Sequence, residues 1–144
     1  MIRRMEARDL AVVLSIQKAS PELAQWKIWD YERVITGEMA GWVAEDGKSL
    51  IGFVVARQIL DEVEILNIAV APDARRRKAG TQLLRAAFEW ARANGGRRVF
   101  LETRVSNGGA IAFYQIHGFH EIGRRAKYYL SPVEDAIVLA MNLE

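Results

Sequence analysis

The spacing of apolar residues changes repeatedly along this chain, and it predicts an alternation of strands and helices. Apolar residues three and four positions apart indicate a helix, whereas short apolar runs bounded by turn residues indicate a buried strand. We expect strands at about 2–7, 42–45, 50–56, 63–70, 99–103, 119–130 and 136–143. We expect helices at about 10–19, 79–94 and 107–117. A further helix should follow a loop at 25–32 and end at about 37.

Residues that start or stop regular structure stand between these segments. Asp9 can cap the first helix, Ser20-Pro21 ends it, and Asp46-Gly47 can join two strands as a hairpin. The resulting order, β-α-α-β-β-β-α-β-α-β-β, predicts an α/β fold with a mixed sheet in one domain over residues 1–144. The strand–helix–strand unit from Val63 to Thr103 should form a right-handed crossover.

The composition is that of an ordinary globular protein, and it excludes several other classes. Of the 144 residues, 51% are hydrophobic and 26% are charged. No apolar run approaches the roughly 18 residues that a membrane span needs. The first residues carry charges with no apolar stretch behind them, so we expect no secretory signal and a cytoplasmic protein.

The absence of cysteine narrows the chemistry further. Disulfides, zinc–thiolate sites and a cysteine nucleophile are all excluded. The two histidines, His117 and His120, stand three apart near a Gly-Phe pair and make a poor metal site. Neither has an obvious serine or aspartate partner for a catalytic triad. We therefore expect no metal cofactor.

A local cluster of positive charge is the first sign of a ligand. The net charge is only +2, yet Arg75-Arg76-Arg77-Lys78 forms a basic run between a buried strand at 65–70 and a helix near Gly80. Helix N-termini bind phosphate through free N–H groups, and ligands of α/β sheets bind at strand carboxyl ends. This placement favours an anionic small molecule over a solvated basic loop. The motifs of nucleotide triphosphatases and dinucleotide folds are absent.

Several segments together resemble a known family. They are Asn67-Ile68-Ala69-Val70 followed by Pro72-Asp73, the basic turn ending in Gly80, Leu83-Leu84, Leu101–Asn107, Ala110–Tyr114, Gly118-Phe119, Tyr128-Tyr129 and Glu134–Ala136. This set resembles the GNAT superfamily of acetyltransferases. Within the superfamily it is most similar to the bacterial ribosomal-protein-alanine N-acetyltransferases. The likeness runs from about Leu60 to the C-terminus, and before Leu60 it is one of topology.

The resemblance implies a fold, a donor and roles for individual residues. The fold would be the single-domain acyl-CoA N-acyltransferase fold, a central mixed twisted sheet flanked by helices, and the donor would be acetyl-CoA. Glu102 would act as general base, and Tyr114 would protonate the departing thiolate. Donor binding would fall to Ile68, Ala69 and Val70 along the pantetheine arm, to Arg75, Arg76, Arg77, Lys78, Ala79, Gly80 and Thr81 at the pyrophosphate, and to Asn107.

The resemblance also implies a partner, the N-terminal α-amine of a protein, which in this branch is the N-terminal alanine of a small-subunit ribosomal protein. Trp26, Tyr31 and Tyr128 are candidate acceptor-binding residues. We expect no membrane or specific nucleic-acid partner, and a monomer or weak dimer. Two positions depart from the family: Lys78 replaces the first glycine of the turn, and Gln25–Trp29 lacks the usual Pro-Trp.

Other interpretations of the same residues stay open. Glu102 could pair with Arg104 or Arg98, Tyr114 could be a core aromatic, and Asn107 could cap its helix. The acceptor could be a polyamine or an aminoglycoside, bound through the acidic residues Asp61, Glu62 and Glu64. A domain without enzymatic activity could use the basic turn to bind RNA or to regulate, although no aromatic residues are interleaved with its cations for base stacking.

Overall fold

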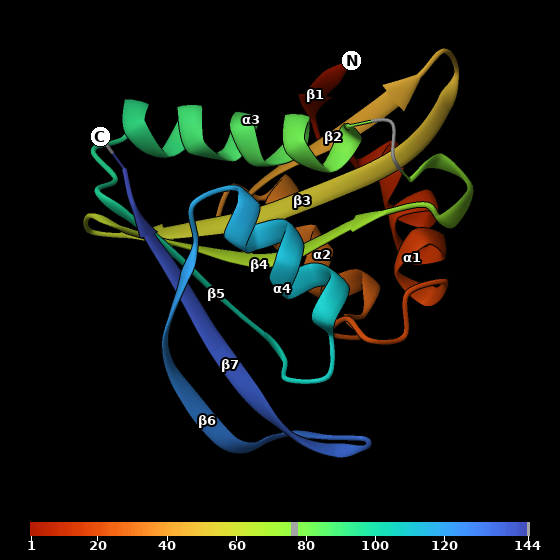
Figure 1. The fold of residues 1–144 in the computed structure, drawn as a ribbon. Helices are drawn as coiled ribbons and strands as arrows, with labels where there is room; N and C mark the ends of the chain where they lie inside the picture. Colours follow the sequence, from red (N-terminus) through yellow and green to blue (C-terminus); the bar gives the residue numbers. More distant parts are fainter. Residues whose placement is uncertain (76–77, 144) are drawn as a thin grey trace.

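In the computed structural model, which describes residues 1–75 and 78–143, the chain folds around a twisted seven-stranded sheet (Figure 1). The strands are β1 (Ile2–Arg4), β2 (Ala40–Asp46), β3 (Ser49–Ile59), β4 (Glu62–Val70), β5 (Arg98–Arg104), β6 (His120–Leu130) and β7 (Val133–Asn142). The α-helices of the described part are α1 (Leu10–Lys18), α2 (Ile28–Ile35), α3 (Ala79–Ala93) and α4 (Gly108–Ile116). Their order confirms the predicted succession of elements and the mixed α/β class.

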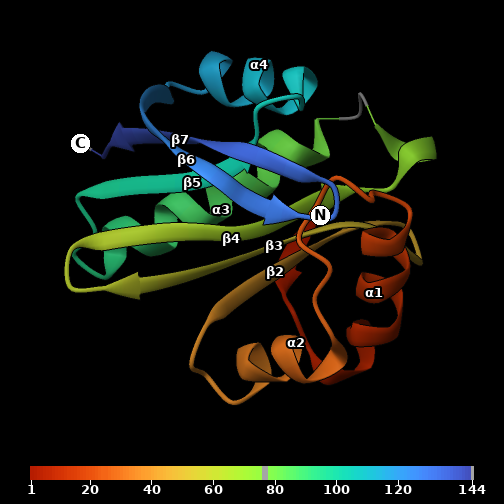
Figure 2. The ribbon, with the colours of Figure 1, turned by 90° about the horizontal axis from the view of Figure 1, so that it is seen from below.

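The sheet has the order β1-β2-β3-β4-β5-β7-β6, and every neighbouring pair is antiparallel except β4 and β5. Helix α3 makes the crossover between these two parallel strands. Figure 2 shows α3 and α4 on one face of the sheet, with α1 and α2 on the other. Each face therefore has its own apolar cluster. One is built around Leu83, Leu84 and Leu139, and the other around Val13, Tyr31 and Phe53.

The two parallel strands separate soon after they pair. Glu62–Glu64 of β4 lies in register with Arg98–Phe100 of β5, and the pairing ends there. On its other side β4 stays paired with β3 as far as Val70, with a bulge at Val55/Ala56. The edge of β4 after Glu64 therefore faces β5 without a strand partner, and its backbone groups are open to a ligand.

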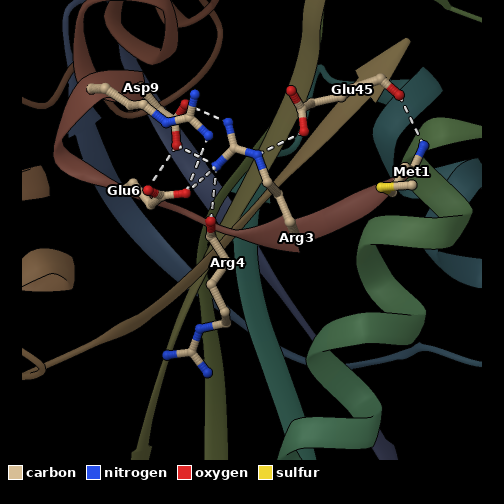
Figure 3. Close-up of polar contacts among 7 residues, drawn as sticks. Met1, Arg3, Arg4, Glu6, Asp9 and Glu45 are labelled. Carbon is tan, nitrogen blue, oxygen red and sulfur yellow. Dashed lines mark hydrogen bonds and ion pairs between the residues drawn. The ribbon is translucent and has the colours of Figure 1, made fainter. Parts of the chain in front are cut away.

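The N-terminal strand is held by a network of ion pairs centred on Arg3 (Figure 3). The Arg3 guanidinium donates to Asp9 Oδ1 and Oδ2 at 2.7 and 2.8 Å and to Glu45 Oε1 at 2.6 Å. The hydrogen bonds from Arg3 hold the pKa of the Asp9 carboxyl below its usual value. Asp9 stands at the expected N-cap of α1, but its carboxylate makes no cap bond, because it binds Arg3 and the Glu6 N–H instead.

The boundaries of several elements differ from those predicted. Strand β1 is shorter than expected, because residues 7–9 form a turn of 3-10 helix. Strand β3 is longer and reaches Ile59, because it pairs with β4 from Gly52 to Ile59. No helix within the described residues is long and apolar enough to cross a membrane.

Candidate active site

A cavity of about 890 Å³ opens where β4 and β5 separate. Its walls come from the α1–α2 loop, β4, the start of α3, β5, α4 and β6. These walls contain most of the residues singled out in the sequence. Ile68, Ala69, Val70, Arg75, Lys78, Ala79, Gly80, Thr81, Glu102, Asn107, Tyr114 and Tyr128 all line this one cavity. Arg76 and Arg77 lie outside the described residues.

One end of the cavity is built mainly from backbone. The unpaired edge of β4 runs along it, and the N-terminus of α3 closes it. The first helical bond of α3 is donated by Gln82 N to Lys78 O, at 3.0 Å. The N–H groups of Ala79, Gly80 and Thr81 precede that bond, so they have no acceptor within the helix. They carry the positive end of the helix dipole, which suits an anion.

Lys78 adopts the conformation that the family's glycine would favour. It caps α3 with φ 62° and ψ 13°, in the left-handed region where a Cβ is unfavourable. At Gly80 the constraint is steric, because a Cβ there would lie 3.1 Å from Phe113 Cζ. The described residues at the start of α3 thus include one left-handed lysine and one glycine with little room for a Cβ.

Side-chain hydrogen bonds hold this end of the cavity against the α1–α2 loop and α4. Arg75 donates from Nε to Val70 O at 3.3 Å and from an Nη to Ser20 Oγ at 3.2 Å, which joins the basic turn to the α1–α2 loop. His117 lies 2.8 Å from Phe113 O through Nδ1 and 3.0 Å from Thr81 Oγ1 through Nε2. Since a carbonyl only accepts, Nδ1 carries the proton in this contact. His117 therefore ties the end of α4 to the start of α3.

The other end of the cavity carries the candidate catalytic carboxylate. The Glu102 side chain is only 9% exposed, and its Oε1 lies 3.2 Å from Arg125 Nε on β6. Its Oε2 is buried and has no hydrogen-bond partner among the described residues. The sequence-based alternative that Glu102 pairs with Arg98 or Arg104 is wrong, because Arg98 pairs with Glu62 and Arg104 with Glu134. One carboxylate oxygen is thus free to accept a proton.

Tyr114 is both a core aromatic and part of the cavity wall. Its ring packs against Phe113 and Phe119, with centroids 5.4 and 5.5 Å apart. Burial, with a smaller contribution from Tyr129, raises the pKa of Tyr114 well above the usual value of a phenol. The hydroxyl therefore keeps its proton throughout the neutral range.

Asn107 caps α4, which is the alternative role that the sequence left open. Its Oδ1 accepts from Ala110 N at 3.3 Å, and the residue also lines the cavity. Because the cap uses only the side-chain oxygen, the amide N–H groups stay available to a ligand.

Of the three candidate acceptor residues, the cavity wall includes only Tyr128. Tyr31 is fully buried, which corrects its predicted contact with a substrate. Its hydroxyl donates to Gln17 Oε1 and accepts from Asn67 Nδ2 at 3.0 Å. Trp26 packs half-buried against the Tyr31 ring at 5.1 Å, away from the cavity. Trp26 belongs to the α1–α2 loop, and its contact with Tyr31 packs that loop against α2.

Sequence reasoning missed some of the residues that shape this loop. Asn67 also donates to Ala24 O at 3.3 Å, and Gln17 Nε2 donates to Trp26 O at 2.9 Å. A glutamine within the apolar face of α1 was the available signal, because a buried amide needs polar partners.

Comparison with known proteins identifies the class to which this fold and site belong. The family model described as "Acetyltransferase (GNAT) family" matches residues 6–119. The chain therefore belongs to the GNAT family and is an acetyltransferase.

Individual similar proteins include N-acetyltransferases with named acceptors. A Bacillus subtilis protein described as a candidate ribosomal protein bS18-alanine N-acetyltransferase is 31% identical over 143 residues, which span 99% of this chain and 95% of the relative. The crystal structure of the ribosomal-protein-S18-alanine N-acetyltransferase from Escherichia coli superposes with a TM-score of 0.85 at 27% identity, covering 100% of this chain and 94% of that one. An Arabidopsis thaliana NAA60 structure in complex with acetyl-CoA has a TM-score of 0.88 at 20% identity, covering 99% and 98%, and shares the fold.

Proposed function

We propose that this enzyme transfers an acetyl group from acetyl-CoA to the N-terminal α-amine of a protein, with the N-terminal alanine of ribosomal protein bS18 as the acceptor. One observation carries the proposal. A single cavity joins a helix N-terminus suited to phosphate with a carboxylate oxygen that is buried and unpaired among the described residues. The names of relatives from Bacillus subtilis and Escherichia coli, both ribosomal protein bS18-alanine N-acetyltransferases by description, support the choice of acceptor.

Two features of this structure fit the donor. The open edge of β4 at Ile68, Ala69 and Val70 offers peptide groups to the amides of a pantetheine arm, which would add to the sheet like an extra strand. The N–H groups that open α3 suit its pyrophosphate, with Arg75 and Lys78 as nearby cations. Bound there, acetyl-CoA would supply the acetyl group as an activated thioester.

The residues at the other end of the cavity would accept and donate the protons of the reaction. Glu102 Oε2 would take the proton of the attacking amine, directly or through a water molecule, while Arg125 holds Oε1. The Tyr114 hydroxyl, which burial keeps protonated, would give a proton to the departing thiolate. Asn107 would bind the donor through its free amide N–H groups.

An α-amine suits a site in which one carboxylate, Glu102, acts as the base. Its pKa of about 7.7–8.0 leaves roughly a tenth of the molecules neutral at pH 7, whereas lysine with a pKa of about 10.4 has well under a thousandth. The difference corresponds to about 3.5 kcal/mol. Because the chain has no cysteine, the amine would attack the donor directly, without a cysteine thioester on the enzyme.

The structure gives little support to a small cationic acceptor. Of the three acidic residues considered for that function, only Glu64 lines the cavity, and its Oε1 is bound by Arg57 at 2.9 Å. Membership of an acetyltransferase family also argues against a purely RNA-binding domain.

A direct assay tests the proposal. The enzyme is incubated with acetyl-CoA and peptides that differ only in their first residue, beside a polyamine and an aminoglycoside, and the products are read by mass spectrometry. We expect acetylation of the α-amine with the alanine-starting bS18 peptide preferred. A higher kcat/KM for either small amine would contradict the proposed acceptor.

A further inference from the structure

The wall of the cavity on the acceptor side is held from behind by one arginine. Arg104 ends β5 and does not itself line the cavity. Its side chain, 11% exposed, donates to Ser131 O at 3.1 Å and to Pro132 O at 3.0 Å, both in the turn between β6 and β7. Its guanidinium also lies over the Tyr129 ring, 4.4 Å from the centroid. Tyr129 does line the cavity.

The same arginine joins this hairpin to a second segment. Arg104 donates to Glu134 Oε1 at 3.1 Å, and Glu134 Oε2 accepts from Ser106 N at 2.7 Å. The hydrogen bonds from Ser106, and then Arg104, hold the pKa of the Glu134 carboxyl below its usual value. Ser106 directly precedes Asn107, so the arginine and the glutamate together connect the β6–β7 turn to the loop that starts α4.

Tyr129 lies at the end of the cavity that contains Glu102, so a displacement of its ring would change the shape of that end. Burial, followed by its neighbours Tyr128 and Glu102, raises the pKa of Tyr129 to about 12. Tyr129 in turn contributes to the raised pKa of Tyr114. The ring held by Arg104 thus lines the same cavity as both candidate catalytic groups.

We propose that Arg104 is a positioning residue for the acceptor: by stacking on Tyr129 and bonding the β6–β7 turn, it sets the shape of the wall against which the acceptor binds. This inference rests on the proposed function, in which the amine reaches Glu102 at this end of the cavity. The side chain must be arginine, because a planar guanidinium can stack on a ring and donate in several directions at once. A lysine would keep the positive charge, but it would lose the stacking on the ring and the several N–H donors of the guanidinium.

The test compares Arg104→Lys with the wild-type enzyme by steady-state kinetics. We expect the KM of the acceptor to rise about 5- to 10-fold, while the dissociation constant of acetyl-CoA, measured by calorimetry, stays within about twofold. Arg98→Lys is the matched control, since Arg98 lies on the same strand, is more exposed and pairs with Glu62 outside the cavity. It should leave both constants unchanged.

A double-mutant cycle with Tyr129→Leu asks whether Arg104 acts through the ring. We expect Arg104→Lys to raise the acceptor KM by a smaller factor in that background than in the wild type, because the stacking contact is already gone and only the bonds to the β6–β7 turn and Glu134 are left to lose. An acceptor KM within twofold of wild type in folded Arg104→Lys would overturn the inference. So would an equal loss of donor affinity, or fully additive effects in the cycle.

The outcome is separable from that of the proposed function. If the wild-type enzyme acetylates a small amine in preference to peptides, the proposed acceptor is wrong, and the same KM comparison is made with that amine. A rise in its KM confined to Arg104→Lys would still support the positioning role of Arg104.

Discussion

The two ends of the cavity are built in different ways. The end at β4 and α3 presents backbone groups to its ligand, namely an unpaired strand edge and helix N–H groups. The end at β5 and β6 presents the side chains of Glu102, Tyr128 and Tyr129, brought together from two strands. Backbone groups remain after a substitution as long as the chain path is kept. Side-chain groups do not, so substitutions at the two ends should differ in their effects.

The largest expected effect is at the side-chain end. Glu102→Gln keeps the shape of the side chain but removes the proton acceptor, so kcat should fall about 10²–10⁴-fold. Calorimetry should show that acetyl-CoA binding is kept. Glu62→Gln, on the exposed part of β4 and outside this cavity, is the matched control and should keep full turnover. Unchanged kcat in Glu102→Gln would remove Glu102 from the mechanism.

Tyr114→Phe should have a smaller effect, a fall in kcat of about 10- to 100-fold, because water can replace a proton donor in part. The phenylalanine keeps the packing against Phe113 and Phe119, so stability should change little. Full activity in the variant would leave Tyr114 with a packing role alone.

The pH profile checks the same residue in the wild-type enzyme. Because burial raises the pKa of Tyr114 above about 10, its proton is retained as the pH rises through the assay range. Rates measured from pH 7 to about 9.5 should therefore show no fall that disappears in Tyr114→Phe. A fall in that range that vanishes in the variant would contradict the assignment.

At the backbone end of the cavity, replacement of Lys78 should have only a small effect. Lys78→Gly relieves a left-handed backbone, and we expect the free energy of unfolding to rise by about 0.5–1 kcal/mol. Donor affinity should change by less than about threefold, since the ammonium is one point charge among several groups. A tenfold gain in affinity by calorimetry would show that the lysine obstructs the pyrophosphate.

A substitution far from both ends should leave activity alone. Asp9→Asn breaks the charged pair with Arg3 and should lower the free energy of unfolding by about 1–3 kcal/mol without changing kcat. The pKa of Asp9 is lowered on folding, so its contribution is present at neutral pH and is lost as the pH falls below about 4. Wild type and variant should converge in stability in acid. A difference that persists there would point to packing instead.

The backbone end was largely predictable from the sequence. An apolar strand, a Pro-Asp turn, a basic run and an amphipathic helix follow one another within residues 63–94, so their geometry is local. Even the positive φ at Lys78 could be anticipated from the glycine that the family carries there.

The side-chain end was only partly predictable, because its contacts join residues far apart in the sequence. Glu102 was identified, but its partner Arg125 depended on where β6 falls in the sheet, and the order β5-β7-β6 cannot be read from the chain. Tyr31 was misplaced because only its contacts with Gln17 and Asn67, 14 and 36 residues away, reveal that it faces the core. The contact of Arg104 with Glu134 spans 30 residues and left no local signal.

The central claim, that one cavity holds the donor along β4 with its diphosphate at the start of α3, has one direct test. Wild-type enzyme is titrated with acetyl-CoA and, separately, with free coenzyme A in a calorimeter. Saturable binding of both with one molecule per chain is predicted, because the groups that hold the pantetheine arm and the diphosphate do not depend on the acetyl group. The absence of any binding heat with either compound, over a range of temperatures, would contradict the claim.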